Sequence, residues 1–95
     1  MSKAVQQYIQ NLNPRAFTNN VQRTLYRLLR TNGEWTRQAA LRVPSVDRRL
    51  SDIRNHGEFT VTCRRGSDVG RKNGYVYRLE LKSVTLVRLQ AIFAQ

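Results

Sequence analysis

The sequence predicts a single α+β domain in which helices precede a two-stranded hairpin. Apolar residues recur with the helical period before residue 57, and they alternate with polar residues between residues 59 and 82. The chain has 95 residues, the length of one domain, and its hydrophobic content of 40% is enough for a compact core. Within one domain over residues 1–95 we expect a core (18–82), an N-terminal arm with a short helix (1–17) and a C-terminal helix (83–95).

The clearest helix follows the N-terminal arm, where one apolar stripe is formed by Val21, Leu25, Leu28 and Leu29. Thr18 or Asn19 can cap its start, because both side chains accept a hydrogen bond from a backbone N–H of the first turn. Gly33 suits the left-handed backbone that ends many helices. Within the arm, residues 3–11 also have helical spacing.

Two shorter helical segments are predicted next. Thr36 is suited to cap a brief helix that runs through Arg42. Pro44 disfavours helical backbone at the residue before it, so the chain turns there. Ser45 can then cap a helix over residues 46–56. The inward face and the end of this helix are given by Val46, Leu50, Ile53 and Gly57.

Two runs of alternating residues predict the strands of the hairpin. Phe59, Val61 and Cys63 alternate with polar residues, and the same pattern recurs over residues 75–82. The loop between the two runs, residues 64–74, contains three glycines and four cations. This composition predicts a flexible, basic hairpin tip.

The charge balance is the strongest indication of function. Seventeen Lys and Arg face six Asp and Glu, which gives a net charge of +11. Fourteen of these cations are arginine, whose planar fork binds phosphates and guanine edges through paired hydrogen bonds. A solvated basic surface is the alternative, but a polyanionic partner explains the arginine excess better.

Several classes of protein are disfavoured by residues that the sequence lacks. Cys63 is the only cysteine, so no intramolecular disulfide can form, as expected for a reducing cytoplasm. With His56 as the only histidine, a usual structural zinc site cannot be assembled, and we expect no metal and no cofactor. We expect no membrane span and no signal peptide, because no stretch has the necessary apolar length. No catalytic grouping stands out, so an enzyme is not expected.

Small and apolar residues recur at fixed offsets within residues 36–55, at Ala39, Ala40, Val43, Leu50 and Ile53. This spacing resembles the helix-turn-helix motif of bacterial and phage DNA-binding proteins, in which the two alanines would lie where the first helix meets the second. Two positions depart from the motif, because Pro44 replaces the turn glycine and Ser45 replaces the apolar residue after it.

The resemblance extends to small winged helix-turn-helix proteins of bacteriophages and prophages over residues 20–81. Its further elements are the Leu-rich first helix, Trp35-Thr36, Leu50 to Arg54 before Gly57, and Tyr75 to Leu79. The resemblance implies a three-helix core with a two-stranded β-hairpin wing, to which this chain adds short N-terminal and C-terminal helices. It also implies that the helix over residues 46–56 enters the major groove of DNA.

The candidate recognition residues follow from a helical wheel. Arg48 and Asn55 point away from the inward face, where Arg48 could fork onto guanine and Asn55 onto adenine. The full candidate set in this helix is Ser45, Asp47, Arg48, Arg49, Ser51, Asp52, Arg54 and Asn55. The candidate wing contacts to phosphates or the minor groove are Arg64, Arg65, Arg71 and Lys72, and the candidate backbone contacts are Arg23, Arg27, Thr36 and Arg37.

Some of these side chains could have a structural role instead of contacting DNA. Arg48 could pair with Asp52 four residues away instead of binding a base. Asp47 and Asp52 would repel phosphates, so they would accept from cytosine or orient an arginine. For Cys63 a buried apolar position is favoured, and for His56 an exposed one. A position in the core or at an element junction is favoured over stacking on a single strand for the four aromatic residues Trp35, Phe59, Tyr75 and Tyr77.

We expect sequence-specific binding to double-stranded DNA by a phage or bacterial transcriptional regulator, in the cytoplasm of a bacterial or phage-infected cell. The alternatives are an architectural or recombination accessory protein, a small phage protein that binds and inhibits a host protein and, less favoured, an RNA-binding protein. The apolar tail either packs on the first helix or forms a homodimer through the C-terminal helix, which would match a palindromic site.

Overall fold

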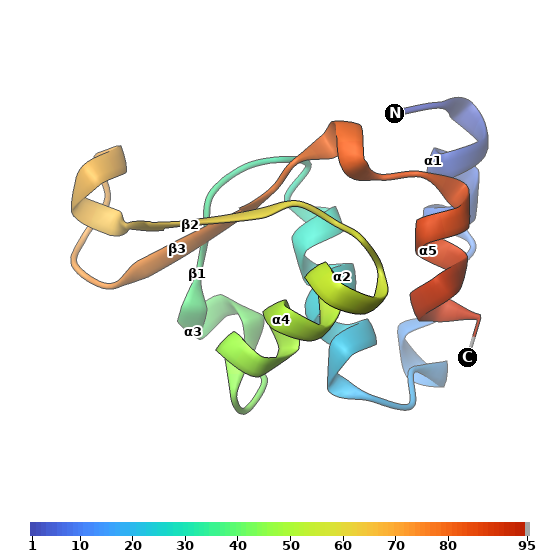
Figure 1. Ribbon diagram of the computed structural model, residues 1–95, viewed down its shortest axis with the longest axis horizontal. Coiled ribbons are helices and arrows are strands. Elements are labelled where there is room, and N and C mark those ends of the chain that lie inside the picture. Colours follow the sequence, from blue (N-terminus) through green and yellow to red (C-terminus); the bar gives the residue numbers. More distant parts are fainter. Residues whose placement is uncertain (95) are drawn as a thin grey trace.

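In the computed structural model, which describes residues 1–94, an antiparallel sheet lies against a group of helices (Figure 1). The α+β class predicted from the sequence is confirmed. The helices of this region are α1 (Lys3–Gln10), α2 (Asn20–Arg30), α3 (Gln38–Leu41), α4 (Val46–His56) and α5 (Leu86–Phe93), and its strands are β1 (Thr36–Arg37), β2 (Val61–Arg65) and β3 (Tyr75–Leu79). Short 3₁₀ turns follow α1, β2 and β3.

Helix α2 lies at the centre of the core, as its apolar stripe predicts. Leu25 and Leu28 are fully buried. The helix begins after Asn19, whose Oδ1 accepts a hydrogen bond from the Gln22 N–H at 2.9 Å, so Asn19 and not Thr18 is the N-cap. Beyond the helix, Gly33 has a φ of 85°, which confirms the left-handed backbone expected there.

The sheet contains a strand that the hydrophobic pattern does not predict. β1 pairs with β3, so the strand order is β1-β3-β2 and the predicted two-stranded hairpin is part of a three-stranded sheet. Thr36 lies buried in β1, and the N-cap position of α3 is held by Arg37, so the predicted cap at Thr36 is wrong. A two-residue strand is too short to alternate visibly, and its partner strand is distant in the sequence.

The segment that resembles a helix-turn-helix differs from the prediction in its first helix. β1 takes up Thr36 and Arg37, and Arg42 has a left-handed backbone with a φ of 52°, so α3 is a single turn over Gln38–Leu41. Leu41 is its fully buried residue. Ala39 and Ala40 are both exposed, so their predicted contact with the next helix is wrong. Ser45 precedes α4 with a φ of 53°, and its side chain makes no capping hydrogen bond.

Helix α4 itself confirms the prediction. It spans Val46–His56, Gly57 holds its C-cap, and Val46, Leu50 and Ile53 are buried.

The strands of the hairpin are shorter than the alternation predicts. β2 begins at Val61, so the buried Phe59 lies outside the strand, directly after a positive φ of 57° at Glu58. β3 ends at Leu79, and a 3₁₀ turn at Leu81–Ser83 follows. Cys63 is half-buried and packs against the core.

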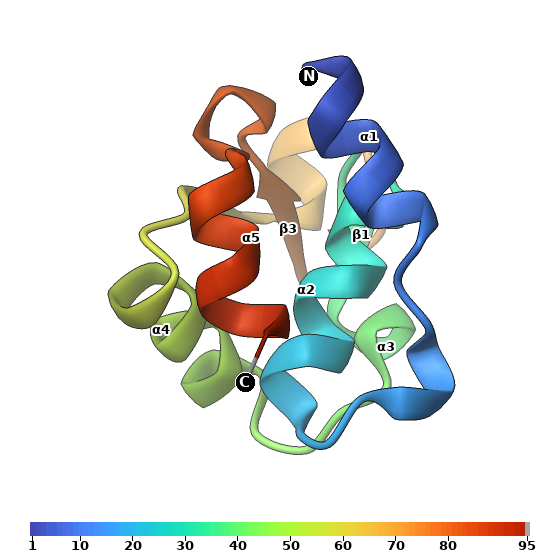
Figure 2. The same cartoon turned by 90° about the vertical axis from the view of Figure 1, so that its right-hand side faces the viewer.

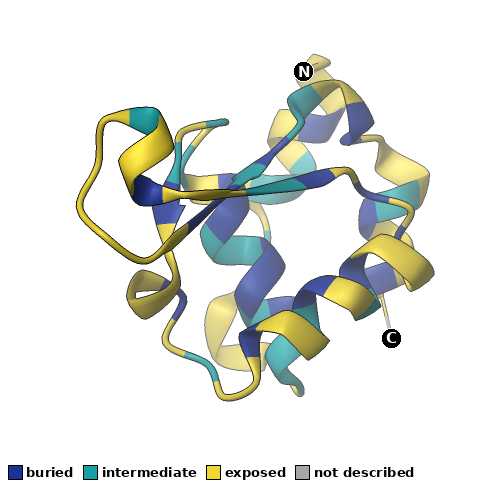
Figure 3. Ribbon diagram, turned by 60° about the vertical axis from the view of Figure 1, so that its left-hand side comes forward, coloured by how far each residue is buried: buried dark blue, intermediate teal, exposed yellow. Residues whose placement is uncertain are grey.

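The core does not extend along the whole hairpin. Tyr77 and Leu79 are buried, but Tyr75 on the same strand is 52% exposed, so its predicted core position is wrong. The reason is geometric, since the hairpin runs past the helices that would cover its outer end (Figures 1 and 3).

Helix α5 closes the core on the side away from the hairpin, where it packs against α1, α2 and α4 (Figure 2). Leu89 and Ile92 are buried, and the Gln22 side-chain amide donates to the Ile92 carbonyl at 3.0 Å. Of the two roles expected for the tail, packing within the chain is therefore observed, and the homodimer stays a prediction. The predicted helix over 83–95 begins later, at Leu86, and Gln95 lies outside the described residues. Within residues 1–94, every helix is too short or too polar to cross a membrane.

Candidate nucleic-acid interface

Helix α4 presents a polar face on the side opposite its buried residues. Arg48, Ser51 and Asn55 are all exposed, and we call these three residues the recognition face. None of their side chains has a hydrogen-bond or ion-pair partner within residues 1–94, and the pairing of Arg48 with Asp52 is not observed there. The recognition face therefore offers a fork of N–H donors, a hydroxyl and an amide to solvent.

One edge of α4 is fixed to the sheet by two polar contacts. Arg54 donates from Nε and Nη2 to the carbonyl oxygen of Val61, at 3.2 and 2.8 Å. Asp47 accepts a hydrogen bond from the Tyr77 hydroxyl at 3.4 Å. These contacts set the orientation of α4 relative to β2 and β3, which gives Arg54 and Asp47 a structural role. Asp47 contacts a tyrosine rather than orienting an arginine.

Burial raises the pKa of Tyr77 to about 12, with a further contribution from the negative charge of Asp47 beside it. The hydroxyl therefore remains a neutral donor to Asp47 throughout the physiological pH range.

The opposite edge of α4 faces the start of α2 and the end of α5. Arg49 and Asp52 are half-buried there, and His56 is exposed as expected. The Arg49 Nε atom is buried without a hydrogen-bond partner among the described residues. A shallow pocket beside this edge is lined by Asn19, Val21, Asp52, His56 and Ile92. Arg49 and Asp52 are thus less accessible than the recognition face.

The hairpin tip, residues 64–74, carries its four predicted cations at exposed positions: Arg64, Arg65, Arg71 and Lys72. The tip has a defined path, because the Gly66 N–H donates to the Gly74 carbonyl at 2.6 Å and the Gly66 carbonyl accepts from the Arg71 N–H at 2.7 Å. A Cβ atom on Gly66 would lie 2.0 Å from the Lys72 carbonyl oxygen, so only glycine fits. Figure 3 shows that most of this tip is exposed.

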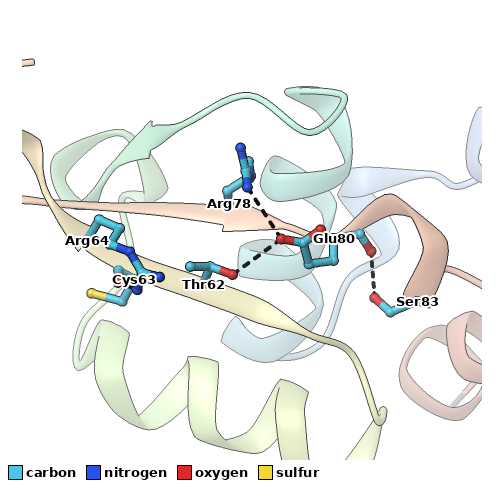
Figure 4. Close-up of polar contacts among 6 residues, drawn as sticks. All are labelled: Thr62, Cys63, Arg64, Arg78, Glu80 and Ser83. Carbon is cyan, nitrogen blue, oxygen red and sulfur yellow. Dashed lines mark hydrogen bonds and ion pairs between the residues drawn. The ribbon is translucent and has the colours of Figure 1, made fainter. Parts of the chain in front are cut away.

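The base of the hairpin is held by a polar network (Figure 4). The guanidinium of Arg78 lies 4.6 Å from the centre of the Trp35 ring and 3.5 Å from the Glu80 carboxylate. The same carboxylate accepts from the Thr62 hydroxyl at 3.4 Å, and the Glu80 carbonyl accepts from Ser83 Oγ at 2.6 Å. Trp35 therefore packs at the junction of β1 and β3, where the Arg78 guanidinium contacts both its ring and the Glu80 carboxylate.

The four residues predicted to contact the DNA backbone are not equivalent. Arg27 donates from Nη1 to the Leu41 carbonyl, and Arg23 donates to the Phe17 carbonyl at 3.3 Å and to Asn20 Oδ1. Thr36 is buried and its hydroxyl is inaccessible, so its side chain does not belong to the basic surface. Arg37 is the member of this set that is exposed.

The four cations of the hairpin tip and Arg37 form an exposed basic group at one end of the molecule, while Lys3, Arg15, Arg30 and Lys82 are exposed elsewhere. Figure 1 shows the hairpin tip projecting past α3 and α4, away from α1 and α5. Arg37, at the start of α3, belongs to the same end of the molecule. The described residues include no cluster of three or more His, Cys, Asp or Glu side chains that could hold a metal ion.

Comparison of the chain with protein-family models, with curated proteins and with solved structures gives no match.

Proposed function

We propose that this protein is a winged helix-turn-helix protein that binds double-stranded DNA sequence-specifically. In this proposal α4 lies in the major groove, and the hairpin tip contacts the backbone or the minor groove. The observation that carries it is the recognition face, where Arg48, Ser51 and Asn55 are exposed and have no partner within residues 1–94.

The dimensions of α4 support its placement in the major groove. Its 11 residues give a length of about 16 Å, and a helix about 10–12 Å across fits a groove about 12 Å wide. Arg48 is the residue type that most often reads guanine, and Asn55 is the type that reads adenine. The contacts of Arg54 and Asp47 with the sheet would hold the recognition face at a fixed angle to the hairpin.

The hairpin tip supports the second half of the proposal. Arg71 and Lys72 are exposed, and the closed turn at Gly66 fixes the backbone that carries them. Phosphate contacts of this kind contribute affinity that depends on salt and not on sequence. The net charge of +11 has the sign that such binding needs.

A role in transcription regulation, in a bacterial cell or in a phage-infected one, is the biological form that we propose. The test begins with the selection of bound sequences from a pool of random duplexes. Affinity for the selected site is then compared with affinity for random duplex over a series of salt concentrations. We expect a preference of about a thousandfold or more and a steep log–log salt dependence.

Three arginine variants separate the proposed roles. Arg48→Ala should weaken the selected site by about 1–3 kcal/mol and leave random duplex almost unchanged. Arg71→Ala should weaken both duplexes about equally and lower the salt slope by about one. Arg15→Ala is the matched control, because Arg15 is an exposed arginine in the 3₁₀ turn Pro14–Ala16, outside both α4 and the hairpin tip. It should have little effect.

The possible results distinguish the proposal from its alternatives. Equal affinity for all duplexes would overturn sequence-specific regulation and would favour an architectural or recombination role. Absence of duplex binding at low salt would overturn DNA binding altogether and would direct attention to a host protein. Equal losses from Arg48→Ala and Arg71→Ala on every duplex would contradict the roles assigned to α4 and to the hairpin tip.

A further inference from the structure

Tyr75 stands apart from the other aromatic residues of the chain. Within residues 1–94, every other Phe, Tyr and Trp side chain is buried or half-buried, whereas Tyr75 is 52% exposed. It lies at the first position of β3, beside Arg65 in the register of the sheet. No described hydrogen bond involves its hydroxyl group. The Tyr75 ring is thus exposed to solvent beyond the end of the hydrophobic core.

Two hollows of the surface meet at Tyr75. The larger, with a volume of about 510 Å³, lies between the start of α3 and the hairpin tip and is lined by Arg37, Gln38, Ala39 and residues 72–76. The smaller, of about 250 Å³, lies within the hairpin tip and is lined by Arg65, Ser67, Asn73, Gly74 and Tyr75. We call the larger hollow the α3–hairpin groove.

The charge around Tyr75 has one sign. Arg37 and Lys72 line the α3–hairpin groove, and Arg65 lines the smaller hollow on the other side of the ring. Neither lining contains an acidic residue, and all three cations are exposed. An aromatic ring among cations suits a ligand that combines phosphates with sugars and flat bases.

We propose that the α3–hairpin groove holds a strand of duplex DNA, with the Tyr75 ring packed against a deoxyribose or a base edge and with Arg37 and Lys72 on the flanking phosphates. This inference rests on the proposed function. With α4 in the major groove and the hairpin tip on the adjacent backbone, the proposed path of the intervening strand is between α3 and the tip. The small side chain of Ala39 leaves room for it there.

The predicted contribution is that of the ring and not of the hydroxyl. We measure the anisotropy of a labelled duplex with the full chain. Tyr75→Ala should bind both selected and random duplex about tenfold more weakly, a loss typical of one aromatic–nucleotide contact. Tyr75→Phe should bind like the unaltered protein. The salt slope should be unchanged in both variants, because no charge is removed, whereas Lys72→Ala should lower it by about one.

The matched control is Val87→Ala, since Val87 is also an exposed apolar residue, 76% accessible, on α5 at the opposite end of the molecule. A second readout does not depend on a variant. Duplex that carries a photoreactive uracil in the strand beside the hairpin should cross-link to Tyr75 of the unaltered protein. Peptide mapping identifies the cross-linked residue.

The outcomes separate this inference from the proposed function. If the unaltered protein fails to bind duplex, the proposed function fails. If it binds duplex but Tyr75→Ala binds equally well, this inference is overturned and the function stands. If Tyr75→Ala binds single-stranded DNA more weakly but binds duplex as the unaltered protein does, the inference about Tyr75 is also overturned. If Tyr75→Ala fails to fold, the cross-link decides, and its absence from Tyr75 counts against the inference.

Discussion

Leu41 and Ala40 are neighbours in the sequence but have opposite environments, and substitutions at these two positions test the packing of α3. Leu41 has no exposed surface, whereas Ala40 is exposed. The spacing of the helix-turn-helix motif instead predicts that Ala40 lies at the contact between the two helices. The pair of substitutions Leu41→Ala and Ala40→Leu therefore distinguishes the two arrangements.

The structure gives the expected size of each effect. Leu41→Ala removes a fully buried side chain and leaves a cavity, which should lower the free energy of unfolding by about 2–5 kcal/mol. A domain of this length is stable by about 5–14 kcal/mol, so the melting temperature should fall by about 10 °C or more. Ala40→Leu adds a side chain at the surface and should change stability by about 0.5 kcal/mol or less.

Urea denaturation is the assay, followed by the fluorescence of Trp35, the only tryptophan. Circular dichroism provides an independent signal, and coincident transitions would support two-state analysis. If Ala40→Leu costs more than about 1 kcal/mol, as overpacking does, and Leu41→Ala costs less than that, the packing described for α3 is wrong.

Two further predictions concern the hairpin and the sheet. Gly66→Ala should cost about 1–3 kcal/mol through overpacking and weaken DNA binding without removing charge, because its Cβ would lie 2.0 Å from the Lys72 carbonyl oxygen. Gly70→Ala is the control in both assays, urea denaturation and DNA binding, because a Cβ at Gly70 meets no neighbouring atom and only the left-handed φ of 74° is unfavourable, by about 1 kcal/mol. If the two variants weaken DNA binding equally, closure of the tip by Gly66 is contradicted. The pKa of Tyr77 is raised from 10.0 to about 12, so the folded protein holds this proton more tightly than the unfolded chain does. The stability that this proton contributes is complete below pH 10 and is lost as the pH rises to about 12. Urea denaturation at each pH should show this loss in the unaltered protein and not in Tyr77→Phe. If the free energy of unfolding falls with pH equally in the two proteins, the linkage is refuted.

The hydrophobic pattern predicts the helices well where a local cause sets their ends. Residues 46–56 are helical as expected, because the apolar positions of α4 repeat with the helical period and Gly57 ends it. Asn19 caps α2 through its own side chain, a contact between residues close in the sequence. The exposure of Arg48 and Asn55 follows from the same period.

The pattern is less informative where an element depends on a distant partner. Thr36 has the sequence features of a helix cap, yet it joins β3, because pairing with Tyr77 satisfies its backbone groups. The predicted contact of Ala39 and Ala40 with the next helix is likewise wrong, since α3 turns Leu41 and not the two alanines toward the core.

The functions of individual arginines are also decided by partners that a local pattern cannot identify. Arg54 and Arg27 both belong to the predicted DNA-binding set, but each donates to a backbone carbonyl, that of Val61 and that of Leu41. Long side chains can reach carbonyl groups well away in the sequence, so a count of cations overstates the number available to a polyanion.

The sequence by itself determined the α+β class, the strong positive charge, the bounds of α4 and the polar character of its outer face. These properties depend on composition and on periods that neighbouring residues set. Only the tertiary structure decided that β1 completes the sheet, that Leu41 fills the core and that Tyr75 faces solvent between Arg37 and Arg65. The physical reason is that alternation along a strand shows which side chains share a face, whereas the packed helices determine how far along that face the core extends.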